Sequence, residues 1–109
     1  MKREHILSIP AKRALKKFGA DIKAARIRRR ITMAIMSERA RISPLTLAKV
    51  EKGDPSVSFG IYVSIIFVLG MVDKIYDLLD ISGDSVGKIL EEERLPKRVR
   101  IPKSKIGDA

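Results

Sequence analysis

The chain has 109 residues, the size of one ordinary domain, and carries 23 Lys and Arg against 13 Asp and Glu, a formal net charge of +10. It has no cysteine and a single histidine, so it lacks the residues for disulfides, thiolate nucleophiles and histidine- or cysteine-ligated zinc. We therefore expect no enzymatic activity and no cofactor, and the excess of positive charge favours a polyanionic partner.

The positive charge is concentrated at the amino-terminal end. Residues 1–31 hold 11 basic and 2 acidic side chains, a net charge of +9, whereas residues 32–90 hold 6 and 7 and residues 91–109 hold 6 and 4. Charge that served solubility alone would not need to gather in one segment. The clustering therefore indicates a surface that meets phosphate groups.

The longest apolar stretch, residues 61–72, is far shorter than the roughly 20 residues that cross a bilayer. It predicts a buried core helix instead. The amino terminus has charged residues but neither the continuous apolar run nor the small-residue cleavage pattern of a signal peptide. These patterns predict a cytoplasmic protein without a membrane partner.

The first predicted helix runs from about Pro10 to Arg29 and follows an irregular segment, residues 1–9. Proline fits the first helical turn because its missing N–H would have no partner there. Gly19 costs a helix about 1 kcal/mol relative to alanine, which predicts either close packing at that point or a looser start upstream. The apolar positions recur at spacings of three and four: Ala11, Leu15, Phe18, Ile22 and Ala25.

Two short helices are expected next, joined by a tight turn. Thr32 can cap the first of them, which runs through residue 40 with Met33, Ile35 and Met36 as apolar positions. Ser43 offers a second cap before a helix that starts at Pro44 and runs to Lys52. Each helix thus has a marked start.

The helix at 44–52 has a small apolar side. It stops at Gly53, which can adopt a positive φ without a Cβ penalty. Leu47 and Val50 lie three residues apart and, with Ile42 before the helix, can pack on the preceding helix. The positions left facing outward are Leu45, Ala48, Lys49 and Lys52.

The later segments are also helical. Ser58 is expected to cap a helix that runs through Leu69, and residues 72–80 and about 84–94 form the last two helical segments. Residues 95–109 are basic and contain two prolines, so we expect a mobile tail or a segment that orders on a partner. The candidate core residues of the helix at 58–69 are Phe59, Val63, Ile66 and Phe67.

A short helix that buries so little is presented to a partner. Two short helices joined by a tight turn and preceded by a basic helix form the helix-turn-helix arrangement, whose second helix enters the DNA major groove. The amino-terminal residues of that helix reach the base edges first. The candidate DNA contacts on this helix are Ser43, Pro44, Leu45, Thr46, Ala48 and Lys49.

Residues 22–70 resemble the five-helix DNA-binding domain of phage repressors and their bacterial relatives, the XRE class. A narrower resemblance, to HipB-like antitoxins, is carried by the runs RRRITMAIMSERA, KVEKGDPSVSFGIY and EEERLPKRVR. The resemblance implies an all-α, compact five-helix repressor-like domain over residues 10–94, with a short sixth helix. It also implies a repressor that controls its own operon and acts as antitoxin of a HipA-like kinase toxin. The alternative is a stand-alone phage-type regulator without a toxin partner.

The resemblance further implies an ion pair between Arg26, on the first helix, and Glu51, at the end of the third. A glutamate at the end of a recognition helix would face phosphates unfavourably unless a cation held it. The alternative is that Glu51 is a solvated charge.

Four positions depart from the pattern of the repressor family. Met33 stands where a glutamine often binds phosphate, so we expect anchoring through the N–H groups behind Thr32. Arg41 stands where the turn commonly has glycine. Pro44 and Leu45 replace the amides that commonly read adenine, and Leu45 can contact a thymine methyl group, the alternative being a dimer or core contact.

Basic residues around the two short helices are the expected phosphate contacts. The arginine run at 28–30 has a simpler alternative, a helix end whose cations complement the macrodipole. Its position beside the helix-turn-helix favours a role with DNA. The full set of expected phosphate contacts is Arg28, Arg29, Arg30, Arg41, Lys49 and Lys52.

One helix-turn-helix module buries a small interface, so such proteins bind mostly as two-fold dimers on palindromic double-stranded DNA. The apolar residues of 61–70 and 75–90 exceed what one small core needs. We therefore expect parts of them to form a homodimer surface. The alternative is that they hold the toxin.

Overall fold

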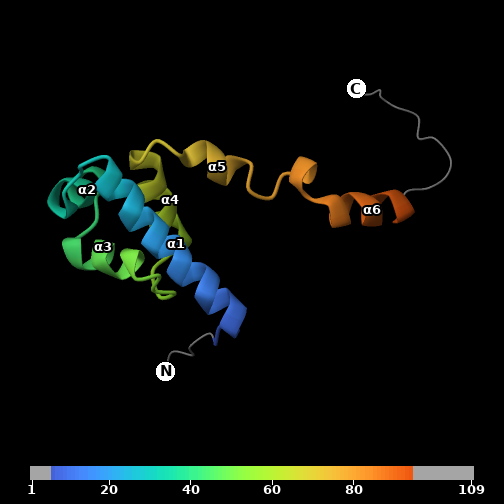
Figure 1. The fold of residues 1–109 in the computed structure, drawn as a ribbon, viewed down its shortest axis with the longest axis horizontal. Coiled ribbons are helices and arrows are strands. Elements are labelled where there is room, and N and C mark those ends of the chain that lie inside the picture. Colours follow the sequence, from blue (N-terminus) through green and yellow to red (C-terminus); the bar gives the residue numbers. More distant parts are fainter. Residues whose placement is uncertain (1–5, 95–109) are drawn as a thin grey trace. The chain divides into compact units, whose positions relative to one another are not determined.

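The computed structural model describes residues 6–94, which contain helices and no strand, so the predicted all-α class is confirmed. The expected tail at 95–109 and the first five residues of the expected irregular segment lie outside the described residues. The helices are α1 (Ile9–Arg28), α2 (Met33–Ala40), α3 (Pro44–Glu51), α4 (Phe59–Val68), α5 (Val72–Tyr76), the 3-10 helix η1 (Ile81–Gly83) and α6 (Ser85–Arg94) (Figure 1).

Hydroxyl side chains fix where the first four helices begin. The three caps expected from the sequence are present, and Ser8 adds a fourth, so α1 begins at Ile9, one residue before the expected start. Each hydroxyl accepts a hydrogen bond from the backbone N–H three residues on. The donor–acceptor distances are 3.3 Å for Ser8, 3.1 Å for Thr32, 3.0 Å for Ser43 and 3.3 Å for Ser58.

The chain forms two compact units that divide between Ile75 and Tyr76, within the stretch that the sequence suggests as one domain. The first unit contains α1 to α4 and most of α5. In the second unit, η1 packs against α6. The helix expected over 72–80 is shorter in the structure and ends at Tyr76. Asp80 begins the next helix, η1, by accepting a hydrogen bond from the N–H of Ser82 at 3.0 Å.

The core of the first unit lies between α1, α2, α3 and α4. α1 packs against α3, and α2 packs against both α3 and α4. Leu47 and Val50 are fully buried, as expected, and Ile42 packs against the core beside them. The buried core residues are Ile22, Ala25, Met36, Ala40, Leu47, Val50, Tyr62, Ile65, Ile66 and Leu69.

The predicted core positions of α4 are partly wrong. Ile66 is buried and Val63 half-buried, but Phe59 is 60% exposed and Phe67 67% exposed. Phe59, Val63 and Phe67 are four residues apart, so they lie on the same, outer side of α4. The side of α4 that faces the core carries Tyr62 and the buried residues one turn after it. Because α4 is apolar on all sides, periodicity alone did not separate the two sides.

α1 and the end of α3 approach closely at two glycines. A Cβ at Gly19 would lie 2.6 Å from the backbone nitrogen of Gly53 and would also meet the carbonyl oxygen of Val50. Gly19 is itself buried in the contact. The first of the two explanations for this glycine, close packing, is therefore confirmed.

Gly19→Ala is expected to lower the free energy of unfolding by about 1 to 3 kcal/mol, because the added methyl group meets backbone atoms that cannot turn away. Gly60→Ala is the matched control, since a Cβ there has only the Ser58 hydroxyl within 4 Å, at 3.9 Å. In a helix this substitution is neutral or stabilising by up to about 1 kcal/mol. Urea denaturation of both variants measures the difference, and equal stabilities would contradict the close approach.

Candidate nucleic-acid interface

A turn of three residues, Arg41 to Ser43, joins α2 to α3. Arg41 has φ 61° and ψ 45°, the left-handed conformation usual for glycine at the end of a helix. Its N–H donates to the carbonyl of Glu38 at 3.2 Å, and the N–H of Ile42 donates to that of Ser37 at 3.0 Å. These bonds close α2, and they leave the Arg41 side chain exposed beside the turn.

α3 presents one side to solvent. Leu45 is 68% exposed, and Lys49, one turn further along, is also exposed. Of the other expected contacts on this helix, Ser43, Pro44 and Lys52 are exposed, whereas Thr46 and Ala48 are half-buried. Because Leu45 is exposed, it is not a core residue. A core contact is therefore excluded, and a dimer contact remains as the alternative to a contact with a thymine methyl group.

The hydroxyl groups at the start of α3 bind each other. Ser43 Oγ accepts from the N–H of Thr46 at 3.0 Å and donates to Thr46 Oγ1, also at 3.0 Å. The two hydroxyls are thus held in the cap. Leu45 and Lys49 are exposed on α3, and among the described hydrogen bonds neither side chain bonds to another part of the chain.

Behind α3, Arg26 and Glu51 form the expected ion pair. Arg26 Nε lies 2.6 Å from Glu51 Oε2, and Nη2 lies 3.1 Å from Oε1, so two parallel hydrogen bonds join the groups. Nη1 donates to the carbonyl of Ile31 at 2.9 Å. The side chains are 9% and 5% exposed, so Glu51 is not a solvated charge. A two-point contact of this kind fixes orientation as well as distance, and it fastens α3 to α1.

The three arginines at the end of α1, residues 28–30, do not share one environment. Arg29 Nη1 donates to the carbonyl of Ala25 at 2.9 Å, so this side chain closes its own helix in the way the macrodipole alternative describes. Arg28 borders a groove formed with α4 and α5. Arg30 is exposed and has φ 55°. The three side chains of the run therefore have different neighbours, although all three are exposed.

Thr32 stands at the start of α2 and is exposed. Its hydroxyl accepts from the N–H of Ile35, so the N–H groups of Met33 and Ala34 remain without an acceptor inside the helix. Met33 itself packs against the core. The start of α2 therefore offers backbone donors to an anion, as expected from the sequence, and no side-chain donor from Met33.

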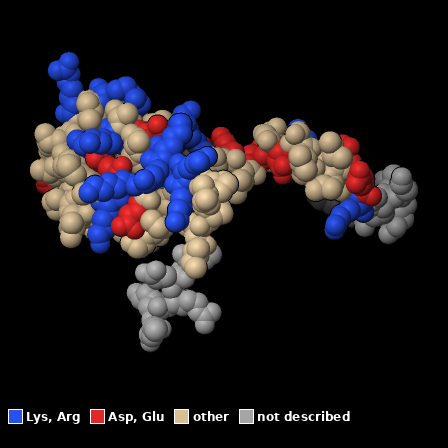
Figure 2. All heavy atoms as spheres, turned by 60° about the horizontal axis from the view of Figure 1, so that its bottom comes forward, with Lys and Arg blue, Asp and Glu red and all other residues tan. Residues whose placement is uncertain are grey.

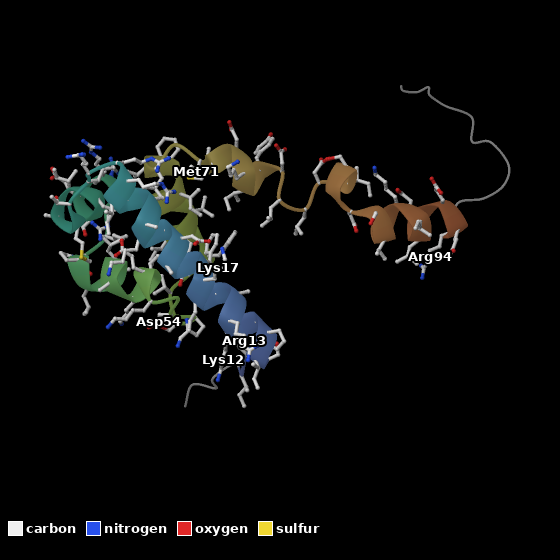
Figure 3. The ribbon with its side chains drawn as sticks, viewed as in Figure 1. Lys12, Arg13, Lys17, Asp54, Met71 and Arg94 are labelled. Carbon is white, nitrogen blue, oxygen red and sulfur yellow. The ribbon has the colours of Figure 1, made fainter. Side chains whose placement is uncertain are left out.

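Further cations lie along α1. Figure 2 shows Lys and Arg side chains gathered across the forward face of the first unit, with a few Asp and Glu among them. Residues 6–75 carry 14 basic and 5 acidic side chains, a net charge of +9. The phosphate contacts expected from the sequence do not include the exposed cations in the first half of α1, three of which are labelled in Figure 3: Lys12, Arg13 and Lys17.

The loop after α3 is fixed by Asp54 and Tyr62. The Tyr62 hydroxyl donates to the carbonyl of Asp54 at 2.9 Å, and the N–H of Ser56 donates to the Asp54 carboxylate at 2.8 Å. The bond from Ser56 lowers the pKa of Asp54, and burial raises the pKa of Tyr62. These contacts set the direction in which the chain leaves α3, and so help to position Lys52.

In residues 6–94, none of the helices has both the length and the apolar character that a membrane crossing requires. Comparisons of the chain with protein-family models, with curated proteins and with solved structures give no match. A functional assignment therefore depends on the arrangement of α2, α3 and the surrounding cations.

Proposed function

We propose that this chain is a sequence-specific DNA-binding transcriptional repressor whose α3 enters the major groove of a double-stranded operator. One observation carries the proposal: α3 is held rigidly from behind by the ion pair of Arg26 and Glu51 while Leu45 and Lys49 project from its other side. A helix that is fixed but uncovered is suited to recognition, since little ordering is needed on binding. The net charge of +9 on the same unit supports a phosphate-rich partner.

The side chains on α3 indicate how a base sequence would be read. Leu45 offers only apolar contact, which suits the thymine methyl group, and Lys49 can donate to the O6 and N7 acceptors of guanine. The Ser43 and Thr46 hydroxyls already bind each other. Few base contacts per copy imply modest specificity per half-site, so the proposal includes a homodimer on a palindromic site.

The proposed cellular role is that of a cytoplasmic antitoxin that represses its own operon and binds a HipA-like kinase toxin. The resemblance in the sequence motivates this role, and the exposed apolar residues of the second unit are compatible with a protein partner. The alternative, a phage-type regulator without a toxin, uses the same DNA-binding surface. Co-expression with a HipA-like kinase, followed by co-purification, distinguishes the two roles.

The test of DNA binding is a titration against DNA from upstream of the chain's own gene over a range of salt concentrations. Lys49→Ala is expected to weaken binding and, if Lys49 neutralises one phosphate, to reduce the slope of log affinity against log salt by about 0.9. Leu45→Ala is expected to weaken binding to the operator more than to random DNA and to leave the slope unchanged. Fluorescence anisotropy with labelled duplexes measures both effects.

Lys88→Ala is the matched control, because it removes one exposed lysine from α6, outside the proposed surface. It should leave the affinity and the slope close to those of the unmodified chain. A flat salt response of the unmodified chain, or equal losses for Lys49→Ala and Lys88→Ala, would contradict the proposal.

A further inference from the structure

In the described part of the second unit, residues 76–94, large apolar side chains are exposed and none is buried. Among residues 76–94, Leu79 is 90% exposed, and on α6 Val86, Ile89 and Leu90 are exposed by 65%, 56% and 50%. These three positions have helical spacing, so they form one apolar stripe along α6. A helix of ten residues is marginal in water without packing. The stripe therefore needs a surface to cover it.

The first unit has an apolar groove of about 330 Å³. Met71, labelled in Figure 3 at the turn between α4 and α5, contributes to its floor. The main apolar residues of the groove are Phe18, Ile22, Ile66, Leu69, Met71 and Ile75. α1 borders it from Phe18 to Arg28, about 15 Å of helix, and the ten residues of α6 also span about 15 Å.

Charges at the two surfaces are complementary. Residues 6–75 have a net charge of +9, whereas residues 76–94 carry 6 acidic and 2 basic side chains, a net charge of −4. Arg28 and Lys74 border the groove, together with one carboxylate, Asp21, which pairs with Lys17 at 2.7 Å. On α6, Glu93 follows Ile89 by four residues and Leu90 by three, so it continues the apolar stripe. An acidic group in that position favours a groove that has cations at its border.

We propose that α6 of one copy binds in this groove of a second copy, with Val86, Ile89 and Leu90 on the apolar floor and Glu93 beside Arg28 and Lys74. The exchange is reciprocal, so one homodimer contains two such contacts. A single contact of three apolar side chains is small compared with stable protein interfaces, and two symmetric contacts double the buried area. The inference deepens the homodimer of the proposed function and rests on it for its role on DNA.

The first test measures self-association of the full chain without DNA by sedimentation equilibrium. Ile89→Asp is expected to raise the dimer dissociation constant at least tenfold, because it places a carboxylate on the apolar floor. Leu79→Asp makes the same chemical change off the stripe and should leave the constant within about twofold. Glu93→Lys and Lys74→Glu should each weaken the dimer, and the combination should restore it. A monomeric unmodified chain, or equal effects of Ile89→Asp and Leu79→Asp, would overturn the proposal.

The second test identifies which copy supplies the helix. Because the chain has no cysteine, introduced thiols pair only with each other. One preparation carries Ile89→Cys and a second, of different mass, carries Ile75→Cys. The proposal expects a disulfide between the two chains on mild oxidation. A third preparation carries both substitutions in one chain, and a disulfide that forms only within that chain would overturn the proposal. The proposal would also be overturned if α6 became covered only after a kinase partner was added. A dimer that fails to bind DNA would instead contradict the proposed function.

Discussion

Glu51→Ala is expected to lower the free energy of unfolding by about 3 to 5 kcal/mol, because it leaves the buried guanidinium of Arg26 without its counter-charge. Arg26 is 7% exposed and keeps only its bond to the carbonyl of Ile31. A small domain has a total stability of about 5 to 15 kcal/mol, so a loss of this size brings the first unit close to unfolding. Thermal denaturation followed by circular dichroism measures the effect.

Two further variants separate the ion pair from a general loss of charge. Glu38→Ala removes an exposed carboxylate from α2 and should change the stability by less than about 0.5 kcal/mol. The double variant Arg26→Met with Glu51→Leu replaces both charges by apolar groups of similar size, and it should recover much of the stability lost in Glu51→Ala. A melting curve of Glu51→Ala that matches that of Glu38→Ala would show that the pair does not stabilise the fold.

The sequence predicted features that depend on local chemistry. The caps Thr32, Ser43 and Ser58 were predictable because a hydroxyl group at a helix start bonds to the backbone three residues away, without help from the tertiary structure. The stop at Gly53 follows from one residue's freedom to adopt a positive φ, here 73°. The pair of Arg26 and Glu51, 25 residues apart, was expected from the resemblance to repressors, supported by the need for a cation beside a glutamate near phosphates.

Features that depend on the tertiary structure were less predictable. In α4, the side that faces the core depends on which helix packs against it, here α2. The apolar run itself does not indicate that side, so Phe59 and Phe67 were misplaced. The sequence gives no reason to expect different surroundings for the three arginines at 28–30. In the structure, one of them donates a hydrogen bond to the carbonyl of Ala25 and another borders a groove. The destination of a long side chain depends on what the fold places within its reach.

Three contacts together determine how α3 is presented. Gly19 and Gly53 let the backbones of α1 and the end of α3 approach, the ion pair fastens the same two helices, and Leu47 fills the core beneath α3. None of these groups lies on the exposed side of α3. A change in any of them should therefore alter DNA binding through the position of Leu45 and Lys49 or through unfolding, without the loss of a direct contact.

Gly53→Ala is expected to destabilise the first unit for two reasons that a control can separate. Gly53 has φ 73°, a conformation that costs an alanine about 1 to 2 kcal/mol. Its added Cβ would also lie 2.5 Å from the carbonyl oxygen of Leu15 and 2.7 Å from the Cα of Lys16, and relief of such overpacking costs about 1 to 3 kcal/mol more. Urea denaturation monitored by circular dichroism gives the total.

Gly70→Ala supplies the conformational cost alone, because Gly70 has φ 79° and a Cβ there would have nothing within 4 Å. The difference between the two variants therefore measures how closely α1 passes the end of α3. If Gly53→Ala loses more stability than Gly70→Ala, the backbone contact that positions α3 is rigid. Equal losses would mean that α1 can move away from α3, and that the position of α3 depends on the ion pair and the core alone.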